Sequence, residues 1–253
     1  MTNSHSRIAL VTGGGSGIGA SAAEALLKDG WYVVIAGRRQ EVLDSFISRV
    51  GVLTKNVSAV AADVTDEQSV MSLFATIKEK YGRLDLLFNN AGTVAPAVEI
   101  DQLSLDDWNR VVSVNLTGVF LCTREAFGMM RNQQPQGGRI INNGSISAYM
   151  PRPLSIAYTA TKHAISGLTK TTQLDGRKFN IACSQIDVGN AATDIGSGNG
   201  QSALQADGSK KDEPLISADE VARAVVYMAS LPLEANVANM TIMATKMPFV
   251  GRG

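Results

Sequence analysis

The chain has 253 residues, of which 45% are hydrophobic and 18% charged, which is enough apolar material for a sizeable core within one domain. Its 23 basic and 23 acidic residues give a formal charge of zero, so the sequence lacks the positive field that binding to nucleic acid or to an anionic membrane surface requires. We therefore expect neither partner.

The amino-terminal segment is a short polar lead that passes directly into an apolar run at residues 7–12. It has neither the basic start nor the long apolar stretch and small-residue cleavage site of a signal peptide. No stretch of the sequence approaches the roughly 20 consecutive apolar residues that span a bilayer. The sequence therefore predicts a cytoplasmic protein without a membrane segment.

Apolar runs rich in β-branched residues alternate along the chain with segments of helical periodicity. We expect seven strands, at Arg7–Thr12, Trp31–Ala36, Val57–Ala62, Leu84–Phe88, Arg139–Asn143, Ile181–Ile186 and Met240–Ala244. We expect six helices, at Ile18–Asp29, Gln40–Val50, Asp66–Tyr81, Leu105–Arg131, Ala157–Phe179 and Ala218–Leu231. Strands that are apolar throughout and joined by helices are typical of a parallel sheet with both faces covered. We predict a single α/β domain over residues 1–253, with a doubly wound, seven-stranded parallel sheet of the Rossmann type.

The first expected strand ends in a glycine-rich segment, Thr12 to Gly19, that leads directly into a helix. Glycine permits a tight turn and a close approach of phosphate, and the start of a helix presents unpaired N–H groups and the positive end of its dipole. An ordinary glycine turn is the alternative, but the position after the first strand favours a dinucleotide pyrophosphate site. The expected contacts are Gly13, Gly15, Ser16, Gly17, Ile18 and Gly19.

The end of the second expected strand indicates which dinucleotide binds. A fold that favours NAD usually places an acidic residue there, against the ribose hydroxyls. This chain has Gly37, Arg38 and Arg39 instead, so an acid that would repel a 2′-phosphate is absent, and a guanidinium is present to pair with it. The sequence predicts NADP(H) in preference to NAD(H), although one of the two arginines has a solvated helix start as its alternative.

Tyr158 and Lys162 lie four residues apart at the start of an expected helix, and therefore on one helix face. An ammonium group beside a phenol stabilises the phenolate, which makes the pair a proton donor and acceptor. Alone, this pair is a common surface pattern. Here Ser145 lies thirteen residues upstream, just after the fifth expected strand, and Asn115 lies on the long preceding helix.

Together with Asp63-Val64 and Asn89 to Gly92, these residues follow one another in an order that resembles the short-chain dehydrogenase/reductase family, from Ile8 to the last strand. The resemblance implies an oxidoreductase that acts on CH–OH donors and transfers a hydride between the nicotinamide and a secondary alcohol or ketone. Tyr158 would be the general acid in reduction and the general base in oxidation.

The resemblance also implies roles for the other residues. Ser145 would bind the substrate oxygen, Lys162 the nicotinamide ribose, and Asn115 a water that links Lys162 to solvent. The further cofactor contacts that it implies are Asp63 and Val64 at the adenine, Asn90, Ala91 and Gly92 behind the cofactor, and Val188, Gly189 and Thr193 at the carboxamide or a phosphate. It implies a homotetramer or homodimer paired through the two long helices, and no metal is expected.

Two features depart from the family's pattern. Val188 stands where many members have proline after the sixth strand, which leaves that turn less constrained. The carboxyl-terminal segment lacks the glycine-rich ending that is frequent in acyl-carrier-protein reductases, which argues against a role in fatty-acid synthesis. Substrate identity stays open, and a catalytically silent NADP-binding regulatory or scaffold protein is the alternative function.

We expect the substrate pocket between Val94–Val98, Ile146–Leu154 and the polar, glycine-rich segment 190–214. That segment is interpreted as a substrate lid, with an inert insertion as the alternative. Tyr149, Met150 and Pro151 are either an apolar pocket wall or packing residues. Arg152 is a candidate for binding a substrate carboxylate, although an exposed loop arginine is the favoured interpretation. Cys122 and Cys183 are expected to be buried thiols.

Overall fold

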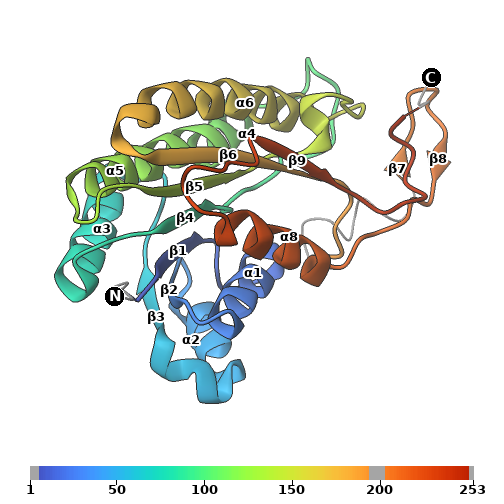
Figure 1. Cartoon of the computed structure of the whole chain (residues 1–253). Helices are drawn as coiled ribbons and strands as arrows, with labels where there is room; N and C mark the ends of the chain where they lie inside the picture. Colours follow the sequence, from blue (N-terminus) through green and yellow to red (C-terminus); the bar gives the residue numbers. More distant parts are fainter. Residues whose placement is uncertain (1–5, 194–202, 251–253) are drawn as a thin grey trace.

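The computed structural model describes residues 6–193 and 203–250, and its centre is a seven-stranded sheet with helices on both faces (Figure 1). All neighbouring strands run parallel, in the order β3-β2-β1-β4-β5-β6-β9. The strands are β1 (Ile8–Thr12), β2 (Tyr32–Gly37), β3 (Val57–Ala61), β4 (Leu86–Asn89), β5 (Gly138–Asn143), β6 (Ile181–Val188) and β9 (Asn239–Ile242). The predicted doubly wound parallel sheet is confirmed.

Two apolar cores fill the space between the sheet and its helices. One face carries α1 (Gly17–Lys28), α2 (Gln40–Arg49) and α8 (Ala218–Ser230). The opposite face carries α3 (Glu67–Tyr81), α4 (Leu105–Val112), α5 (Gly118–Asn132) and α6 (Ile156–Gly176). Central strands such as β1 and β6 are buried along their whole length, because both faces of the sheet are covered.

Local signals fix the helix ends. The side chains of Asp66 and Ser104 accept hydrogen bonds from N–H groups in the first turns of α3 and α4, and Ser217 does the same for α8. Helix α3 ends at Gly82, whose φ of 71° is left-handed. The predicted starts of these three helices, at Asp66, Leu105 and Ala218, lie within one residue of the observed starts.

The long helix predicted at Leu105–Arg131 is interrupted. A π-helical turn at Ser113–Thr117 separates α4 from α5. It contains Asn115, whose amide hydrogen-bonds the backbone of Thr93 on both its N–H and C=O. Wider turns of this kind occur frequently at functional sites, and here the wider turn accompanies a buried side chain that is bound to a neighbouring loop.

The region after β6 differs from the prediction. Within the expected lid, residues 194–202 lie outside the described residues, but β7 (Ala203–Leu204) and β8 (Lys210–Lys211) form a short antiparallel pair that was not predicted. This pair projects away from the main sheet (Figure 1). Ala191 pairs with Ile216, which returns the chain to the sheet before α8.

Candidate active site

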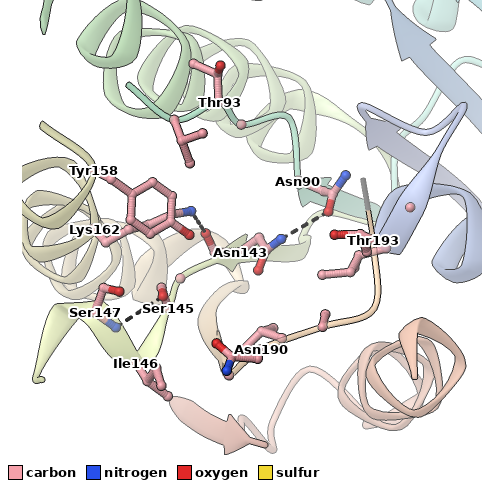
Figure 2. A pocket seen from close by; sticks show the side chains of 18 of the residues that line it. Asn90, Thr93, Asn143, Ser145, Ile146, Ser147, Tyr158, Lys162, Asn190 and Thr193 are labelled. Carbon is pink, nitrogen blue, oxygen red and sulfur yellow. Dashed lines mark hydrogen bonds between the residues drawn. The ribbon is translucent and has the colours of Figure 1, made fainter. Parts of the chain in front are cut away.

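The carboxyl ends of β1, β4, β5 and β6 surround a cavity of about 280 Å³ (Figure 2). This is the edge at which parallel α/β sheets bind ligands. Its lining includes these predicted site residues: Gly13, Ser16, Gly17, Ile18, Asn90, Ala91, Gly92, Ser145, Tyr158, Lys162, Val188, Gly189 and Thr193. Residues from five separate segments therefore meet at one place.

The glycine-rich turn after β1 has the shape of a close-packed cradle. Gly13 and Gly17 have φ angles of 63° and 52°, which side-chain-bearing residues rarely adopt. A Cβ on Gly19 would lie 2.2 Å from the carbonyl oxygen of Gly13. Helix α1 begins at Gly17 directly behind this turn, so its positive end faces the cavity.

The turn is tied to the segment that follows β4. Thr12 Oγ1 accepts hydrogen bonds from the backbone N–H groups of Asn90 and Ala91, at 3.0 and 3.1 Å. The Asn90 amide in turn donates to the carbonyls of Thr12 and Gly13. Thr12 was not predicted as a site residue, because its contribution is to hold two loops together and depends on their tertiary contact.

Tyr158 and Lys162 are on one face of α6, and both border the cavity (Figure 2). The Lys162 Nζ lies 5.4 Å from the centre of the Tyr158 ring and donates a 2.6 Å hydrogen bond to the backbone carbonyl of Asn143. Lys162 is only 6% exposed, so its charge acts in a partly desolvated setting. The arrangement holds an ammonium close to a phenol that can exchange a proton with a molecule in the cavity.

Ser145 lies just beyond β5 at the same cavity, and its hydroxyl accepts the N–H of Ser147 at 3.1 Å. Asn115 is 1% exposed, and its amide also donates to Thr161 Oγ1 at 3.4 Å. It is thus positioned behind α6 and is not among the residues that line the cavity in the described part of the chain. The water-binding role that the resemblance implies for Asn115 stays a prediction.

The residues at this cavity fit a bound dinucleotide. Beyond the glycine cradle, the side-chain Oδ1 of Asn143 is buried and has no hydrogen-bond partner within the described residues, although the same amide donates to Asn90 Oδ1 at 3.0 Å. Asn143 also lines the cavity. Since an orphaned buried acceptor is costly, a ligand that donates an O–H or N–H there would be stabilised.

The buried carboxylate of Asp187 hydrogen-bonds the turn that carries Ser145. Asp187 Oδ1 accepts the backbone N–H of Ser145 at 2.9 Å, and Oδ2 accepts the Tyr149 hydroxyl at 3.0 Å. Burial, the charge of Asp187 and this hydrogen bond together raise the pKa of Tyr149. Asp187 was not predicted as a site residue, because its contribution depends on the Ser145 and Tyr149 groups that the fold brings to it. Nothing in the sequence of β6, which also contains Ser184 and Gln185, distinguished it.

The favoured interpretation of Arg152 as an exposed loop residue is wrong. Its side chain is 16% exposed and forms an ion pair of 2.5 Å with Glu213, whose side chain is 2% exposed. Asn190 joins the pair, because its amide accepts from Arg152 and donates to Glu213. Arg152 also lines the cavity, so it is a charge-compensated part of the pocket wall.

Hydrogen bonding explains the acidity of Glu213. Burial alone would raise the pKa of this carboxyl, but hydrogen bonds from Arg152, Gln205 and Asn190, with the charge of Arg152, outweigh burial and lower the pKa to about 2. Glu213 is therefore ionised at neutral pH and neutralises the guanidinium at the pocket.

The other pocket predictions have mixed outcomes. Val94 and Ala95 line the cavity, as do Ile146 and Leu154. In contrast, Tyr149, Met150 and Pro151 are not among its lining residues in the described structure, and Tyr149 and Met150 are 48% and 41% exposed. They therefore do not form the apolar wall.

The residues predicted to contact the adenosine half lie outside the cavity. Arg38 and Arg39 are exposed between β2 and α2. Asp63 Oδ1 accepts from the backbone and hydroxyl of Thr65, and Val64 is packed against Gly118. Gly15, like Gly19, belongs to the turn without lining the cavity. Their roles toward the cofactor stay predictions.

Residues 6–193 and 203–250 hold neither a metal-ligating cluster nor a membrane-spanning helix. In that part of the chain, three or more histidine, cysteine, aspartate or glutamate side chains do not gather as a metal ion would need. The helices found there are too short or too polar to cross a bilayer. Cys122 and Cys183 are both buried, as predicted, and burial raises the pKa of each thiol to about 12.

Comparison with known proteins gives matches over most of the chain. Residues 7–203 match the family model described as short chain dehydrogenase. The chain is 39% identical over 180 residues to a 3beta-hydroxysteroid dehydrogenase of Mediterraneibacter gnavus, covering 71% of this chain and 64% of that protein. It is 32% identical over 245 residues to a 3-oxoacyl-(acyl-carrier-protein) reductase of Synechocystis, covering 95% and 96% of the two chains.

A solved structure is similar over nearly the whole chain. The 3-ketoacyl-(acyl-carrier-protein) reductase of Brucella melitensis, complexed with NADH, superposes with a TM-score of 0.83 at 25% identity. The match covers 95% of this chain and 98% of that one.

Proposed function

The chain belongs to the short-chain dehydrogenase family and is an oxidoreductase of that family, and we propose that it transfers a hydride between NADP(H) and a secondary alcohol or ketone, with Tyr158 as general acid and base. The observation that carries this proposal is the meeting of Tyr158, Lys162 and Ser145 at one cavity, beside the glycine cradle after β1.

The residues divide the chemistry between them. A nicotinamide, when bound, supplies or accepts the hydride. In reduction, the Tyr158 hydroxyl gives its proton to the substrate oxygen as the carbonyl carbon gains the hydride, and in oxidation the phenolate takes that proton back. Ser145 holds the substrate oxygen by a hydrogen bond, and Lys162 places its positive charge 5.4 Å from the centre of the Tyr158 ring.

The preference for NADP(H) is part of the proposal. The cofactor is a nicotinamide dinucleotide, and the similar reductase of Brucella melitensis was solved with NADH, so the proposed preference for NADP(H) rests on this chain's own residues. Strand β2 ends at Gly37 with no acid after it, and Arg38 and Arg39 are exposed at the point where α2 begins. An arginine at that place favours a 2′-phosphate through charge-assisted hydrogen bonds.

The pocket favours a substrate that is uncharged next to Arg152. Val94, Ala95, Ile146 and Leu154 give the cavity apolar lining, and Glu213 already neutralises the guanidinium of Arg152. Two relatives are named as a 3beta-hydroxysteroid dehydrogenase and a 3-oxoacyl-(acyl-carrier-protein) reductase, names that contain an alcohol and a ketone. We extend the proposal to residues 190–214 as a substrate lid, to a single domain and to a cytoplasmic homotetramer or homodimer.

The test is a panel of ketones assayed for NADPH oxidation and of secondary alcohols assayed for NADP⁺ reduction. We expect turnover of at least one member, and Tyr158→Phe should lower kcat by about 100-fold or more while NADPH binding changes by less than about threefold. Tyr227→Phe is the matched control, since Tyr227 is 53% exposed on α8. Tight NADPH binding without turnover of any compound would favour the silent regulatory alternative, and a Tyr158→Phe enzyme with most of its rate would remove Tyr158 from the mechanism.

A further inference from the structure

Asp187, near the end of β6, is a fully buried carboxylate with four hydrogen-bond donors. Its exposed fraction is 0%. Oδ1 accepts the Ser145 N–H at 2.9 Å and the Gln185 amide at 2.7 Å. Oδ2 accepts the Tyr149 hydroxyl at 3.0 Å and the Asn239 amide at 2.7 Å. All four donors are uncharged.

Burial of a carboxylate in this environment carries a desolvation cost in free energy. A buried carboxylate is tolerated only when its oxygens are hydrogen-bonded, and an apolar side chain would avoid the desolvation altogether. Charge-assisted hydrogen bonds are about twice as strong as neutral ones and shorter. A carboxylate at this position therefore fixes its donors more firmly than a neutral side chain could.

The backbone before Ser145 is shaped to the carboxylate. A Cβ on Gly144 would lie 2.0 Å from Asp187 Oδ1, so residue 144 has no room for a side chain while Asp187 is present. The Gly144 N–H donates to the carbonyl of Ile186 at 2.8 Å. The turn that presents Ser145 is thus held against β6 by two consecutive N–H groups.

The same network reaches α6. The Gln185 amide that binds Asp187 also donates to Ser166 Oγ at 3.1 Å, and Ser166 lies on α6, the helix that carries Tyr158 and Lys162. The carboxylate therefore lies between the Ser145 turn and the helix with the other two groups.

We propose that Asp187 is a positioning residue that sets the place of Ser145 relative to Tyr158 and Lys162. The inference rests on the proposed function, because it assigns Asp187 to the reaction through Ser145. Asp187 acts from behind the turn and is not among the cavity-lining residues of the described structure. Loss of this support should weaken the orientation of Ser145 in the transition state more than the binding of substrate.

The first experiment compares Asp187→Asn with Asp85→Asn. Asparagine at 187 presents an amide N–H₂ to at least one of the donors that the carboxylate binds. Asp85 is the matched control, because it also accepts a backbone N–H, that of Ile8 at 2.8 Å, but at the opposite end of the sheet. Asp187→Asn should lower kcat by about 10- to 100-fold with KM and the NADPH dissociation constant within about threefold. Asp85→Asn should lower the melting temperature and leave kcat within about twofold.

The second experiment is a double-mutant cycle with Ser145→Ala. If Asp187 acts through Ser145, adding Asp187→Asn to Ser145→Ala should lower kcat by less than about threefold further, because the group being positioned is already gone. If the loss of kcat in the double variant equals the product of the losses in the two single variants, the inference is overturned and Asp187 has a general structural role.

A measurement on the unmutated protein covers the case in which Asp187→Asn does not fold. The Ser145 amide should exchange its hydrogen far more slowly than an open chain, and exchange at the open-chain rate would overturn the inference. Failure of the unmutated protein to turn over any ketone or alcohol would count against the proposed function, and this exchange measurement would still test the contact with Asp187.

Discussion

Arg38 and Arg39 stand just beyond the last residue of β2, exposed and at the start of α2. At the level of single residues, the side chain at this position determines whether a 2′-phosphate is attracted or repelled. A guanidinium forms two parallel hydrogen bonds with phosphate oxygens, whereas a carboxylate in the same place would bind ribose hydroxyls and repel the phosphate. Cofactor choice therefore depends on one or two residues that leave the rest of the fold unchanged.

Arg38→Asp should weaken NADPH binding by about 10-fold or more, because it replaces an attractive charge with a repulsive one at the 2′-phosphate. NADH binding should change by less than about threefold. Fluorescence titration with both cofactors measures the two constants. Arg39→Asp, made in parallel, identifies which arginine pairs with the phosphate, and an NADPH constant unchanged in both variants would refute the 2′-phosphate argument.

At the scale of elements, the ion pair between Arg152 and Glu213 connects two segments that the main sheet does not hold together. Arg152 precedes α6, and Glu213 follows the β7–β8 pair. Asn190, just beyond β6, hydrogen-bonds both partners. Side chains thus fix the connection that contains Arg152 to the other two connections, which are also joined by the backbone bridge between Ala191 and Ile216.

Glu213→Gln should lower the free energy of unfolding by about 1–3 kcal/mol at pH 7, since it removes a buried, charge-assisted hydrogen bond. The pKa of Glu213 lies at about 2 in the folded protein, below its ordinary value of 4.5. The contribution of ionised Glu213 to the free energy of unfolding is therefore fully present above about pH 4.5 and is lost as the pH falls toward 2. Urea unfolding at several pH values measures it.

The difference between the unmutated protein and Glu213→Gln should be constant from pH 7 to about 5 and then shrink on acidification. Glu220→Gln provides the control, because Glu220 forms an exposed pair with Arg223 on α8. Its effect should stay below about 0.5 kcal/mol. A Glu213 effect as small as that of Glu220, or one that grows below pH 4.5, would contradict the assignment.

At the scale of the whole molecule, apolar side chains remain exposed on the helices predicted to pair. Phe120 on α5 is 50% exposed, and Leu174 on α6 is 59% exposed. Contiguous exposed apolar patches mark association surfaces. Both helices cover the same face of the sheet (Figure 1). The predicted homotetramer or homodimer would use this face as its pairing surface.

Light scattering coupled to size-exclusion chromatography should give a mass of two or four chains. The Phe120→Asp, Leu174→Asp double variant should shift this toward a smaller assembly, because two charges would be buried without partners. Val52→Asp is the control, since Val52 is 90% exposed in the 3₁₀ turn Gly51–Asn56, away from both helices. A monomeric unmutated protein would refute the predicted assembly.

The order of strands and helices, the parallel sheet, and the places of Gly13, Tyr158 and Lys162 could all be predicted from the sequence. These depend on local signals: apolar runs that need two covered faces, a glycine turn between a strand and a helix, and a four-residue spacing that places two side chains on one helix face. Each signal is complete within a short stretch of chain.

The surroundings of Arg152, Asp187 and Asn143 could not be predicted from the sequence, because they form only in the folded chain. Arg152 and Glu213 are 61 residues apart, and Asp187 and Tyr149 are 38 apart, so their pairing depends on how the connections pack at the sheet edge. From the sequence, a loop arginine is interpreted as exposed to solvent when the buried carboxylate that pairs with it lies in a distant segment. The same holds for an orphaned acceptor such as Asn143 Oδ1, because whether a polar atom is paired depends on the complete set of its neighbours in space.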